Sequence, residues 1–531
     1  MAEISWAASR RLGLVFSGGL LMGMTTAPVS AWPLAWVALV PLWVLVVDAS
    51  PIPNPKSQIS YSLAWGIGYH GLALSWIMGI HPMTWMGIPW LISLLIALFC
   101  WTLVTLWGAA LVTVWIWGMT IICRKSLAWV RILVGVALWC GLESFWSNGP
   151  LYWTSISYTQ SPHNLAILHL GQISGPSTVT AALVAVNGLI AEAWLKSHNC
   201  KMSLNVRLFF WPVVCYFLLH AIGFGLYSRP LIQVPETALK VGIIQGNVPN
   251  EIKLYSEGFN RAIEGYTAGY ESLAAQGMDA VLTPEVALPF LWTDSSRVHN
   301  SFYQAVRKWG VVAWLGAYGT QEVGEDLPPA LTTSLFTLSK NGEIFSRYDK
   351  VHLVPLGESL PFEKFLVQLR LSPNKALMVA GKPNQKFDTP FGPAIVGVCF
   401  DSAFPEHFRT QAAAGGEFIL TSSNDAHYSW AMPSQHHAQD VMRAIETNRW
   451  AVRATNTGYS AIVDPHGRTE WLSELNTYEV HAATIYRREN QTLYVRRGDW
   501  LMLVLLLSAG FAWFFNFYRI HKTFSFSEKG V

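Results

Sequence analysis

The amino-acid sequence predicts an α-helical transmembrane bundle of eight spans combined with one water-soluble α/β domain. The chain has 531 residues, of which 52% are hydrophobic and 13% charged, and its mean hydropathy is +0.30. These values are too apolar for a soluble protein of this length, and they exclude a disordered chain, a nucleic-acid-binding tail and an ordinary cytosolic enzyme. Charge is also unevenly distributed, because the only ionised side chains between Leu12 and Cys123 are those of Asp48 and Lys56. Residues 229–498 differ, since they carry charges of both signs and alternate strand-like with helix-like patterns.

Eight apolar stretches are long enough to cross the hydrocarbon core of a membrane, which takes about 20 residues in a helix. Basic residues follow every second stretch, and the alternate loops carry no Lys or Arg before residue 229. Because basic loops remain on the cytoplasmic side, this pattern places both termini in the cytoplasm and the segment after the seventh stretch outside. The stretches are residues 12–28, 31–48, 61–80, 88–118, 126–146, 176–195, 208–227 and 500–518.

The sequence therefore divides into three predicted domains. Residues 1–228 hold spans one to seven, residues 229–498 form an extracytoplasmic domain, and residues 499–531 hold the eighth span and a cytoplasmic tail. Two alternatives remain open. The fourth stretch is so long that two spans there would reverse the orientation of everything after it. Residues 9–11 resemble a twin-arginine signal and residues 29–31 a cleavage site, although cleavage would spoil the alternation of basic loops.

The extracytoplasmic domain shows the patterns of a layered α/β fold. Short apolar runs bounded by turn residues predict buried strands, and longer amphipathic segments between them predict helices. Further segments flank or follow the turns Asn341-Gly342 and His466-Gly467, as the strands of hairpins do. The predicted strands are residues 239–245, 279–283, 311–318, 334–339, 393–399, 417–421, 459–464 and 480–486, and the predicted helices are residues 257–276, 296–309 and 435–454.

Cysteine usage singles out one thiol. Five of the six cysteines lie in or beside the predicted spans, and Cys399 alone lies in the extracytoplasmic domain. A structural cysteine in an oxidising compartment normally has a disulfide partner in its own domain. Cys399 has none, so it is either a reactive free thiol or a buried inert residue.

Three short segments carry polar residues at strand ends, where α/β sheets usually place their sites. They end in or contain Glu285 (TPE), Lys350 (YDK) and Cys399 (VCFD). Acyl transfer through a thiol needs a nucleophile, a base and a cation beside the developing oxyanion, and Cys399, Glu285 and Lys350 can supply these three groups. Taken singly, a Glu after a strand is more often a solvated or capping residue, and most Lys residues lie on the surface.

The ordered trio TPE, YDKVHL and GVCFD resembles the Glu-Lys-Cys signature of the nitrilase, or carbon-nitrogen hydrolase, superfamily. Seven apolar spans before this domain and one after it resemble one membrane branch of that superfamily, the apolipoprotein N-acyltransferase family. Nearly the whole chain takes part in the resemblance, which implies a nitrilase-like αββα sandwich on a membrane bundle. The other matching segments are residues 244–249 (IQGNVP), 352–358 (HLVPLGE), 423–425 (SND), 453–458 (RATNTG) and 496–500 (RRGDW), together with Glu143 and the stretch from Gly149.

The resemblance also implies an activity and its residues. A fatty acyl chain would pass from a phospholipid, commonly phosphatidylethanolamine, through a thioester on Cys399 to the α-amino group of the diacylglyceryl-cysteine of an apolipoprotein. Glu285 would be the general base, Lys350 the oxyanion-stabilising residue and Cys399 the nucleophile. The implied supporting or substrate-binding residues are Glu358, Phe400, Asp401, Asn424 and His427. The expected protein is a monomer of the bacterial cytoplasmic (inner) membrane, with its catalytic domain on the periplasmic side and no cofactor, metal or nucleic-acid partner.

This chain departs from the family pattern at a few positions. Phe400-Asp401 stands where the family often has Tyr-Glu, and Leu254 and His427 stand where Trp is frequent. These departures bear on lipid gating and substrate preference, and Trp430 is a candidate replacement for one missing ring.

Two polar features allow other interpretations. His352, His427, His436 and His437 are poorly spaced for zinc, because His436 and His437 are neighbours and face different directions on a helix. Glu143, an ionisable group near the end of a predicted span, is explained equally by function and by packing.

Two rival functions remain. In a membrane-tethered amidase or nitrilase, water would take the acyl group from Cys399, but a soluble substrate gives no reason for eight spans. In a transporter or sensor, the outer domain would only bind a ligand, but solute pathways usually carry more ionisable residues than these spans contain.

Overall fold

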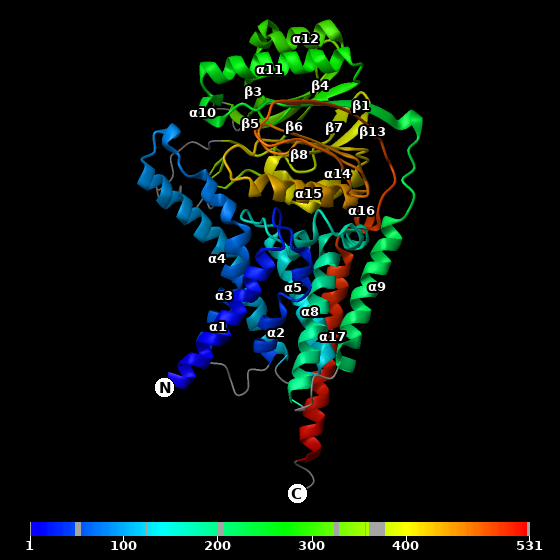
Figure 1. Ribbon diagram of the computed structural model, residues 1–531. Coiled ribbons are helices and arrows are strands. Elements are labelled where there is room, and N and C mark those ends of the chain that lie inside the picture. Colours follow the sequence, from blue (N-terminus) through cyan, green and yellow to red (C-terminus); the bar gives the residue numbers. More distant parts are fainter. Residues whose placement is uncertain are drawn as a thin grey trace. The chain divides into compact units, whose positions relative to one another are not determined.

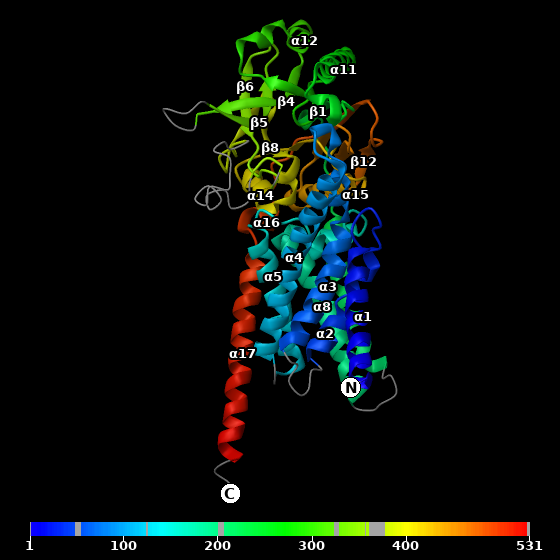
Figure 2. The ribbon, with the colours of Figure 1, turned by 90° about the vertical axis from the view of Figure 1, so that its left-hand side faces the viewer.

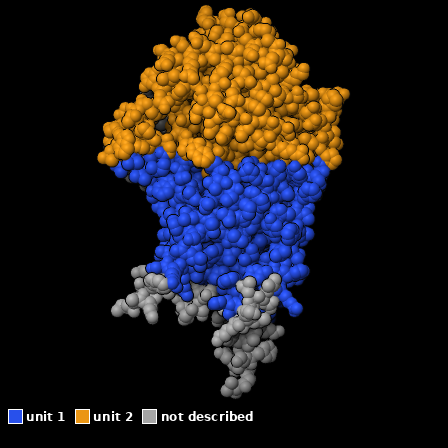
Figure 3. All heavy atoms as spheres, viewed as in Figure 1, with its two compact units in different colours: residues 1–78, 94–229, 497–531 blue, residues 79–93, 230–496 orange. Residues whose placement is uncertain are grey.

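A computed structural model of the protein describes residues 2–47, 55–123, 126–199, 206–322, 329–355, 357–359 and 378–527. The chain divides into two compact units, which Figure 3 shows in different colours. Unit 1 comprises residues 1–78, 94–229 and 497–531, and unit 2 comprises residues 79–93 and 230–496. Unit 2 thus also takes in a short segment that connects the third and fourth predicted spans and overlaps the end of the third and the start of the fourth.

Unit 1 is built from helices that run alongside one another (Figures 1 and 2). Large aromatic side chains fill its interior, including the fully buried rings of Trp43, Trp65, Trp115 and Trp139. The longer helices are α1 (Ala2–Gly23), α2 (Val40–Val47), α3 (Pro55–Ala73), α4 (Trp90–Cys123), α5 (Ala128–Trp146), α8 (Pro176–Asn199), α9 (Phe210–Tyr227) and α17 (Trp500–Ser527), with the short helices α6 (Leu165–Leu168) and α7 (Gly171–Ser174) between them.

Five of these helices are long and apolar enough to cross a membrane, whereas the sequence predicted eight spans. Helix lies in each of the three other predicted stretches, but it falls short of that standard. Residues 31–48 are broken into a 3₁₀ helix, Trp32–Trp36, and α2, Val40–Val47, because Pro33 and Pro41 cannot continue a helical hydrogen-bond ladder. The five qualifying segments are Trp90–Ile122, Ala128–Trp146, Pro176–His198, Arg207–Tyr227 and Trp500–Arg519.

Glu143 of α5 is a packing residue in unit 1. Its buried carboxylate accepts hydrogen bonds from the Ile156 backbone N–H at 2.8 Å, the Ser155 hydroxyl at 2.9 Å, the Thr180 hydroxyl at 2.7 Å and the Trp139 indole at 3.2 Å. Four protein donors fill the acceptor sites of this buried carboxylate. Glu143 therefore fixes the segment after α5 against α8.

Unit 2 contains two β-sheets. The first has the strand order β13-β1-β2-β4-β5-β6, with β3 also paired to β4, and the second has the order β12-β11-β10-β9-β8-β7. Strands β1, β2 and β4 are parallel, as are β8, β9 and β10. The bounds are β1 Ala238–Gln245, β2 Ala280–Leu282, β3 Leu288–Leu291, β4 Val312–Gln321, β5 Ala330–Leu338, β6 Ile344–Asp349, β7 Phe387–Thr389, β8 Gly392–Val398, β9 Ile419–Ser423, β10 Ala451–Thr455, β11 Ala461–Val463, β12 Thr469–Leu472 and β13 Glu479–Tyr486.

The two sheets lie between two layers of helices (Figures 1 and 2). Successive residues of a strand face opposite sides of the sheet, so Val312 and Trp314 of β4 enter the core between the sheets while Ala313 and Leu315 face the outer helices. The helices of the first sheet are α11 (Ser256–Ala275) and α12 (Ser301–Trp309), and those of the second are α14 (Pro405–Ala413) and α15 (Ala431–Thr447). The predicted α/β layering is therefore confirmed, and its order is helix, sheet, sheet, helix.

The predicted helix over residues 435–454 is wrong in its second half. Helix α15 ends at Thr447, where Asn448 adopts a left-handed conformation with φ 57°, and Ala451–Thr455 form the buried strand β10. A short apolar run fits a helix and a buried strand equally well by pattern. The segment forms a strand because it pairs with β9, which is distant in the sequence, and with β11, which follows it closely.

Candidate active site

The structure places Glu285, Lys350 and Cys399 just beyond the ends of three strands. Glu285 follows β2 and Lys350 follows β6 in the first sheet, while Cys399 follows β8 in the second. The sheets are tied together beside Glu285, because the Ser422 hydroxyl of β9 donates to the Thr283 carbonyl at 3.1 Å. This tie explains how residues of two sheets share one site.

The ammonium of Lys350 lies between two carboxylates. Its Nζ donates to Glu285 Oε1 at 2.9 Å and approaches Glu358 Oε2 to 2.8 Å, while Glu358 Oε2 also accepts from the Val354 backbone N–H at 2.8 Å. Lys350 is 1% exposed and Glu285 is also buried. Burial alone would lower the pKa of Lys350, but the charges of Glu285 and Glu358 hold this pKa well above its ordinary value. Lys350 is therefore a permanent cation.

Cys399 is held in a strained backbone conformation. It begins a 3₁₀ helix, Cys399–Ala403, with φ at 50°, in the left-handed region that non-glycine residues seldom adopt. The side chain is buried, and its pKa is raised well above the ordinary value by burial and by the charge of Glu285, against the opposing charge of Lys350. The resting group is therefore a neutral thiol that needs a base before it can attack.

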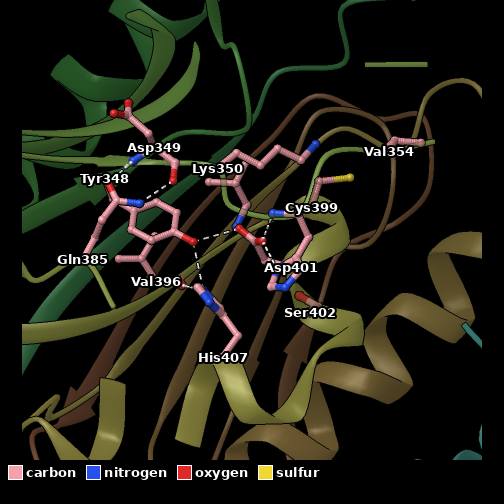
Figure 4. A network of polar contacts seen from close by, with 12 residues as sticks. Tyr348, Asp349, Lys350, Val354, Gln385, Val396, Cys399, Asp401, Ser402 and His407 are labelled. Atoms are coloured by element: carbon pink, nitrogen blue, oxygen red, sulfur yellow. Dashed lines mark hydrogen bonds and ion pairs between the residues drawn. The ribbon is translucent and has the colours of Figure 1, made fainter. Parts of the chain in front are cut away.

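Asp401 supports the loop that carries Cys399. Its Oδ1 accepts from both the backbone N–H and Nδ1 of His352 at 2.8 Å, and its Oδ2 accepts from the Val398 N–H at 3.0 Å and the Tyr348 hydroxyl at 2.9 Å. Figure 4 shows the Tyr348 hydroxyl between Asp401 and His407, with the tips of Lys350 and Cys399 extending away from it. Burial opposes ionisation, but the charge of His407 and the His352 hydrogen bond lower the Asp401 pKa below its ordinary value.

The other predicted supporting residues lie around this loop. Phe400 is buried, and its ring meets that of Phe404 edge-on at 5.1 Å. His427 Nδ1 accepts a hydrogen bond from the Asn250 amide at 2.8 Å, and the His427 ring is nearly parallel to that of Trp85, with centroids 6.0 Å apart. The pKa of His427 is lowered by burial and by the charge of Lys253, so the ring is neutral.

Asn424 joins two neighbouring loops. It donates to the Asn250 side chain at 3.3 Å and accepts from the Asn456 side chain at 3.2 Å.

His427 and Leu254 occupy the positions where the family often has Trp. His427 retains a ring contact there, whereas Leu254 is exposed, and the candidate replacement Trp430 is 62% exposed.

Lys253 is a site residue that sequence reasoning missed. This buried lysine closes the short helix α10 (Asn250–Lys253), and its Nζ donates to the backbone carbonyl of Glu285 at 3.2 Å. Burial lowers its pKa to about 8, against the opposing charges of Glu285 and Cys399. The one indication in the sequence was its position four residues after the segment IQGNVP, which resembles the family. No catalytic or binding role had been assigned to that segment.

Asp425, His436 and Arg453 form a second missed cluster beneath Cys399. One donor atom each of Cys399, Asp425 and His436 lie within 4.8 Å of one another, the spacing of a cation site. Both ring nitrogens of His436 are already hydrogen-bonded, however, Nδ1 to Asp425 at 3.1 Å and Nε2 to the Cys399 carbonyl at 2.8 Å. A metal ligand needs a free lone pair on the ring, so this cluster does not fit a metal. Asp425 and Arg453 lie in the segments SND and RATNTG, which match the family, but the sequence did not indicate the hydrogen bonds that Asp425 makes with Arg453 and His436.

Chemically, the site combines a neutral thiol, a carboxylate and a fixed ammonium. The carboxylate can accept the thiol proton, and the ammonium can stabilise an oxyanion on a carbonyl that the sulfur attacks. This set of groups suits the transfer of an acyl group through a thioester.

Comparisons with known proteins match both parts of the chain. Residues 240–489 match the carbon-nitrogen hydrolase family, and residues 18–189 match the apolipoprotein N-acyltransferase N-terminal domain. The apolipoprotein N-acyltransferase of Nostoc sp. is 57% identical over 94% of this chain and 98% of its own length, and that of Synechocystis sp. is 46% identical over 93% and 98%. A solved nitrilase-superfamily structure from Saccharomyces cerevisiae aligns with 49% of this chain and 93% of its own, at 17% identity and a TM-score of 0.37, too low to support an argument.

Proposed function

This protein belongs to the apolipoprotein N-acyltransferase family, and we propose that it transfers a fatty acyl chain from a membrane phospholipid to the N-terminal α-amino group of an apolipoprotein. The acceptor is the diacylglyceryl-cysteine of the apolipoprotein, and the expected donor is phosphatidylethanolamine. The observation that carries the proposal is the buried contact of Lys350 with Glu285. Both charges act on the thiol of Cys399, the one cysteine in the sequence of residues 229–498.

In the first half-reaction, Glu285 takes the proton of the Cys399 thiol as the sulfur attacks the ester carbonyl of the phospholipid. The carbonyl oxygen becomes an oxyanion, and the ammonium of Lys350 stabilises it. The ester C–O bond then breaks, and the leaving lysophospholipid oxygen takes the proton back from Glu285. The products are a thioester on Cys399 and a free lysophospholipid.

In the second half-reaction, the amine of the apolipoprotein attacks the thioester carbonyl. Lys350 again stabilises the oxyanion, and Glu285 takes a proton from the attacking nitrogen. The C–S bond breaks, an amide forms, and the proton returns to the sulfur. A thiol that is neutral at rest suits this cycle, because its proton then remains on the sulfur and Glu285 is an ionised carboxylate. Glu285 must be able to accept a proton at the start of each half-reaction.

We further propose that the protein is a monomer whose chain crosses the bacterial inner membrane eight times. The catalytic unit lies on the periplasmic side, and both termini lie in the cytoplasm. The alternation of basic loops supports this orientation. The exposed residue Lys340, in the β5–β6 turn, offers a test in a cysteine-free background. A membrane-impermeant maleimide applied to intact spheroplasts should label Lys340→Cys, and labelling only after lysis would contradict the orientation.

The activity is tested with phospholipid labelled in its acyl chains, followed by a diacylated lipopeptide with a free amine. Label is expected first on the protein and then on the peptide, and Cys399→Ala should abolish both steps. Cys215→Ala, which removes another free thiol, is the matched control and should retain both. Release of the label as free fatty acid would instead indicate a hydrolase, and absence of protein-bound label would overturn the thioester mechanism.

A further inference from the structure

His436 contacts the backbone of the nucleophile directly. Its Nε2 lies 2.8 Å from the carbonyl oxygen of Cys399, the residue whose φ of 50° is strained. A carbonyl oxygen only accepts hydrogen bonds, so Nε2 carries a proton and donates it. The hydrogen bond therefore restrains the turn that presents the sulfur.

The other nitrogen of His436 also faces an acceptor. Nδ1 lies 3.1 Å from Oδ1 of Asp425, whose Oδ2 accepts from Arg453 at 3.1 Å. Burial alone would raise the pKa of Asp425, but the charges of its partners lower it. The Arg453 guanidinium, which pairs with Oδ2 at 3.1 Å, by itself favours the ionised carboxylate, which can only accept hydrogen bonds. Nδ1 must then donate as well, and a ring that donates from both nitrogens is an imidazolium.

The charges of the buried cluster favour the same protonation state. Arg453 pairs with Asp425 and, at 2.6 Å, with Asp440, and all four side chains are almost completely buried. With a neutral His436, two carboxylates would face one guanidinium and leave a buried negative charge uncompensated. With an imidazolium, the cluster is neutral, which avoids the large cost of an unpaired buried ion.

We propose that His436 is a positioning residue that acts as an imidazolium, donating a hydrogen bond to the Cys399 carbonyl and placing a second cation, in addition to Lys350, near the sulfur. A ring nitrogen of His436 and an oxygen of Asp425 lie within 4.8 Å of the sulfur. His436 thus offsets the negative charge of Asp425 at the thiol and favours the thiolate that forms during attack and departure. This assignment rests on the proposed function of Cys399 as the nucleophile.

The neighbouring His437 provides a matched control. It is also buried on α15, but its Nε2 contacts the Thr469 hydroxyl at 3.0 Å, and burial lowers its pKa to about 4. His437 is therefore a neutral imidazole whose Nε2 contacts β12, whereas Nε2 of His436 contacts the Cys399 carbonyl. Both His436→Gln and His437→Gln remove an imidazole from α15. Only His436→Gln removes the proposed cation.

The test measures the rate of Cys399 alkylation by iodoacetamide as a function of pH, in the full-length protein with the other cysteines replaced. Alkylation needs no lipid, so the outcome stands even if phospholipid proves not to be the donor. In His436→Gln the alkylation midpoint should rise by about one pH unit, because Asp425 then faces the sulfur without compensation. Acylation by phospholipid should fall about ten- to a hundredfold, whereas His437→Gln should leave both measurements near the parental values.

The other charged groups around the sulfur stay constant in this comparison. Those coupled to Cys399 are Glu285, Lys350, Glu358, Asp425, Lys253, Arg453 and the hydroxyl of Tyr428. A parental midpoint in His436→Gln, or an equal shift in His437→Gln, would overturn the proposal.

A second variant covers the case in which His436→Gln does not fold. Asp425→Asn removes the anion that keeps the second proton on His436, so one negative and one positive charge are lost together. The midpoint should then stay close to the parental value. If His436 were neutral all along, Asp425→Asn would only remove a negative charge, and the midpoint would drop by about one unit, which would contradict the imidazolium.

Discussion

The ammonium of Lys253 donates a hydrogen bond to the backbone carbonyl of Glu285 across 3.2 Å, inside the protein rather than at its surface. A buried lysine whose ammonium donates to a neutral carbonyl is held at a cost in stability. Its electrostatic interaction with Glu285 and Cys399 places this cost at the proposed active site.

Replacement of Lys253 by Met should stabilise the protein and impair acyl transfer. The Lys253 pKa is about 8 in the folded protein and 10.5 in an unfolded chain, so the unfolded state binds more protons between these values. Stability of the parent therefore rises with pH in this window, and the advantage of Lys253→Met should shrink by about 1 kcal/mol between pH 7 and pH 9. Thermal unfolding in detergent checks this, with the exposed Lys308→Met as control; an advantage independent of pH would contradict the shifted pKa.

Replacement of Glu285 by Gln should slow formation of the acyl-enzyme about 10²- to 10⁴-fold at pH 7, because the thiol of Cys399 loses its base. The raised Cys399 pKa gives this variant a characteristic pH dependence. Its residual rate should climb as the solution itself removes the thiol proton at high pH. Intact-protein mass spectrometry of the acylated form measures the rate, and the exposed Glu264→Gln should behave as the parent; a loss that stays constant up to high pH would show that Glu285 is not the base.

Replacement of Lys350 by Met should affect stability and activity together. It leaves Glu285 and Glu358 close to each other without their shared cation, which costs about 3–5 kcal/mol. The double variant Lys350→Met with Glu358→Gln should recover much of this stability but none of the activity, since the oxyanion still lacks its partner. Unfolding and acyl-transfer assays on the same preparations separate the two effects, and recovery of activity in the double variant would exclude an oxyanion role for Lys350.

Replacement of Asp401 by Glu, the residue frequent in the family, should destabilise this protein by about 1–3 kcal/mol. The Asp401 carboxylate fits between the backbone N–H groups of Val398 and His352, and an extra methylene has no room in a completely buried position. The measurement is the denaturation midpoint of Asp401→Glu against the parent, with the exposed Asp388→Glu as control. Unchanged stability would mean that the loop carrying Cys399 adapts freely.

The sequence by itself determined where Glu285 and Cys399 lie in the fold. Glu285 and Cys399 lie at the ends of predicted apolar strands, and the carboxyl ends of strands in layered α/β domains gather at one edge. Lys350 follows β6, Ile344–Asp349, a polar segment that was not among the predicted strands. The short apolar runs of β1 and β4 were likewise recognisable as buried strands. These are local patterns, so they can be recognised without knowledge of distant partners.

Only the tertiary structure decided the states and partners of these groups. The helix that was predicted to continue to residue 454 ends earlier, and Ala451–Thr455 form β10 because they pair with β9. The stability of this pairing depends on both strands, so it cannot be predicted from one segment. Lys253, Asp425 and His436 become part of the site through contacts with residues 32, 28 and 37 positions away in the chain. Burial then fixes their protonation, since the charge that a buried group carries depends on the neighbours that the folded chain supplies.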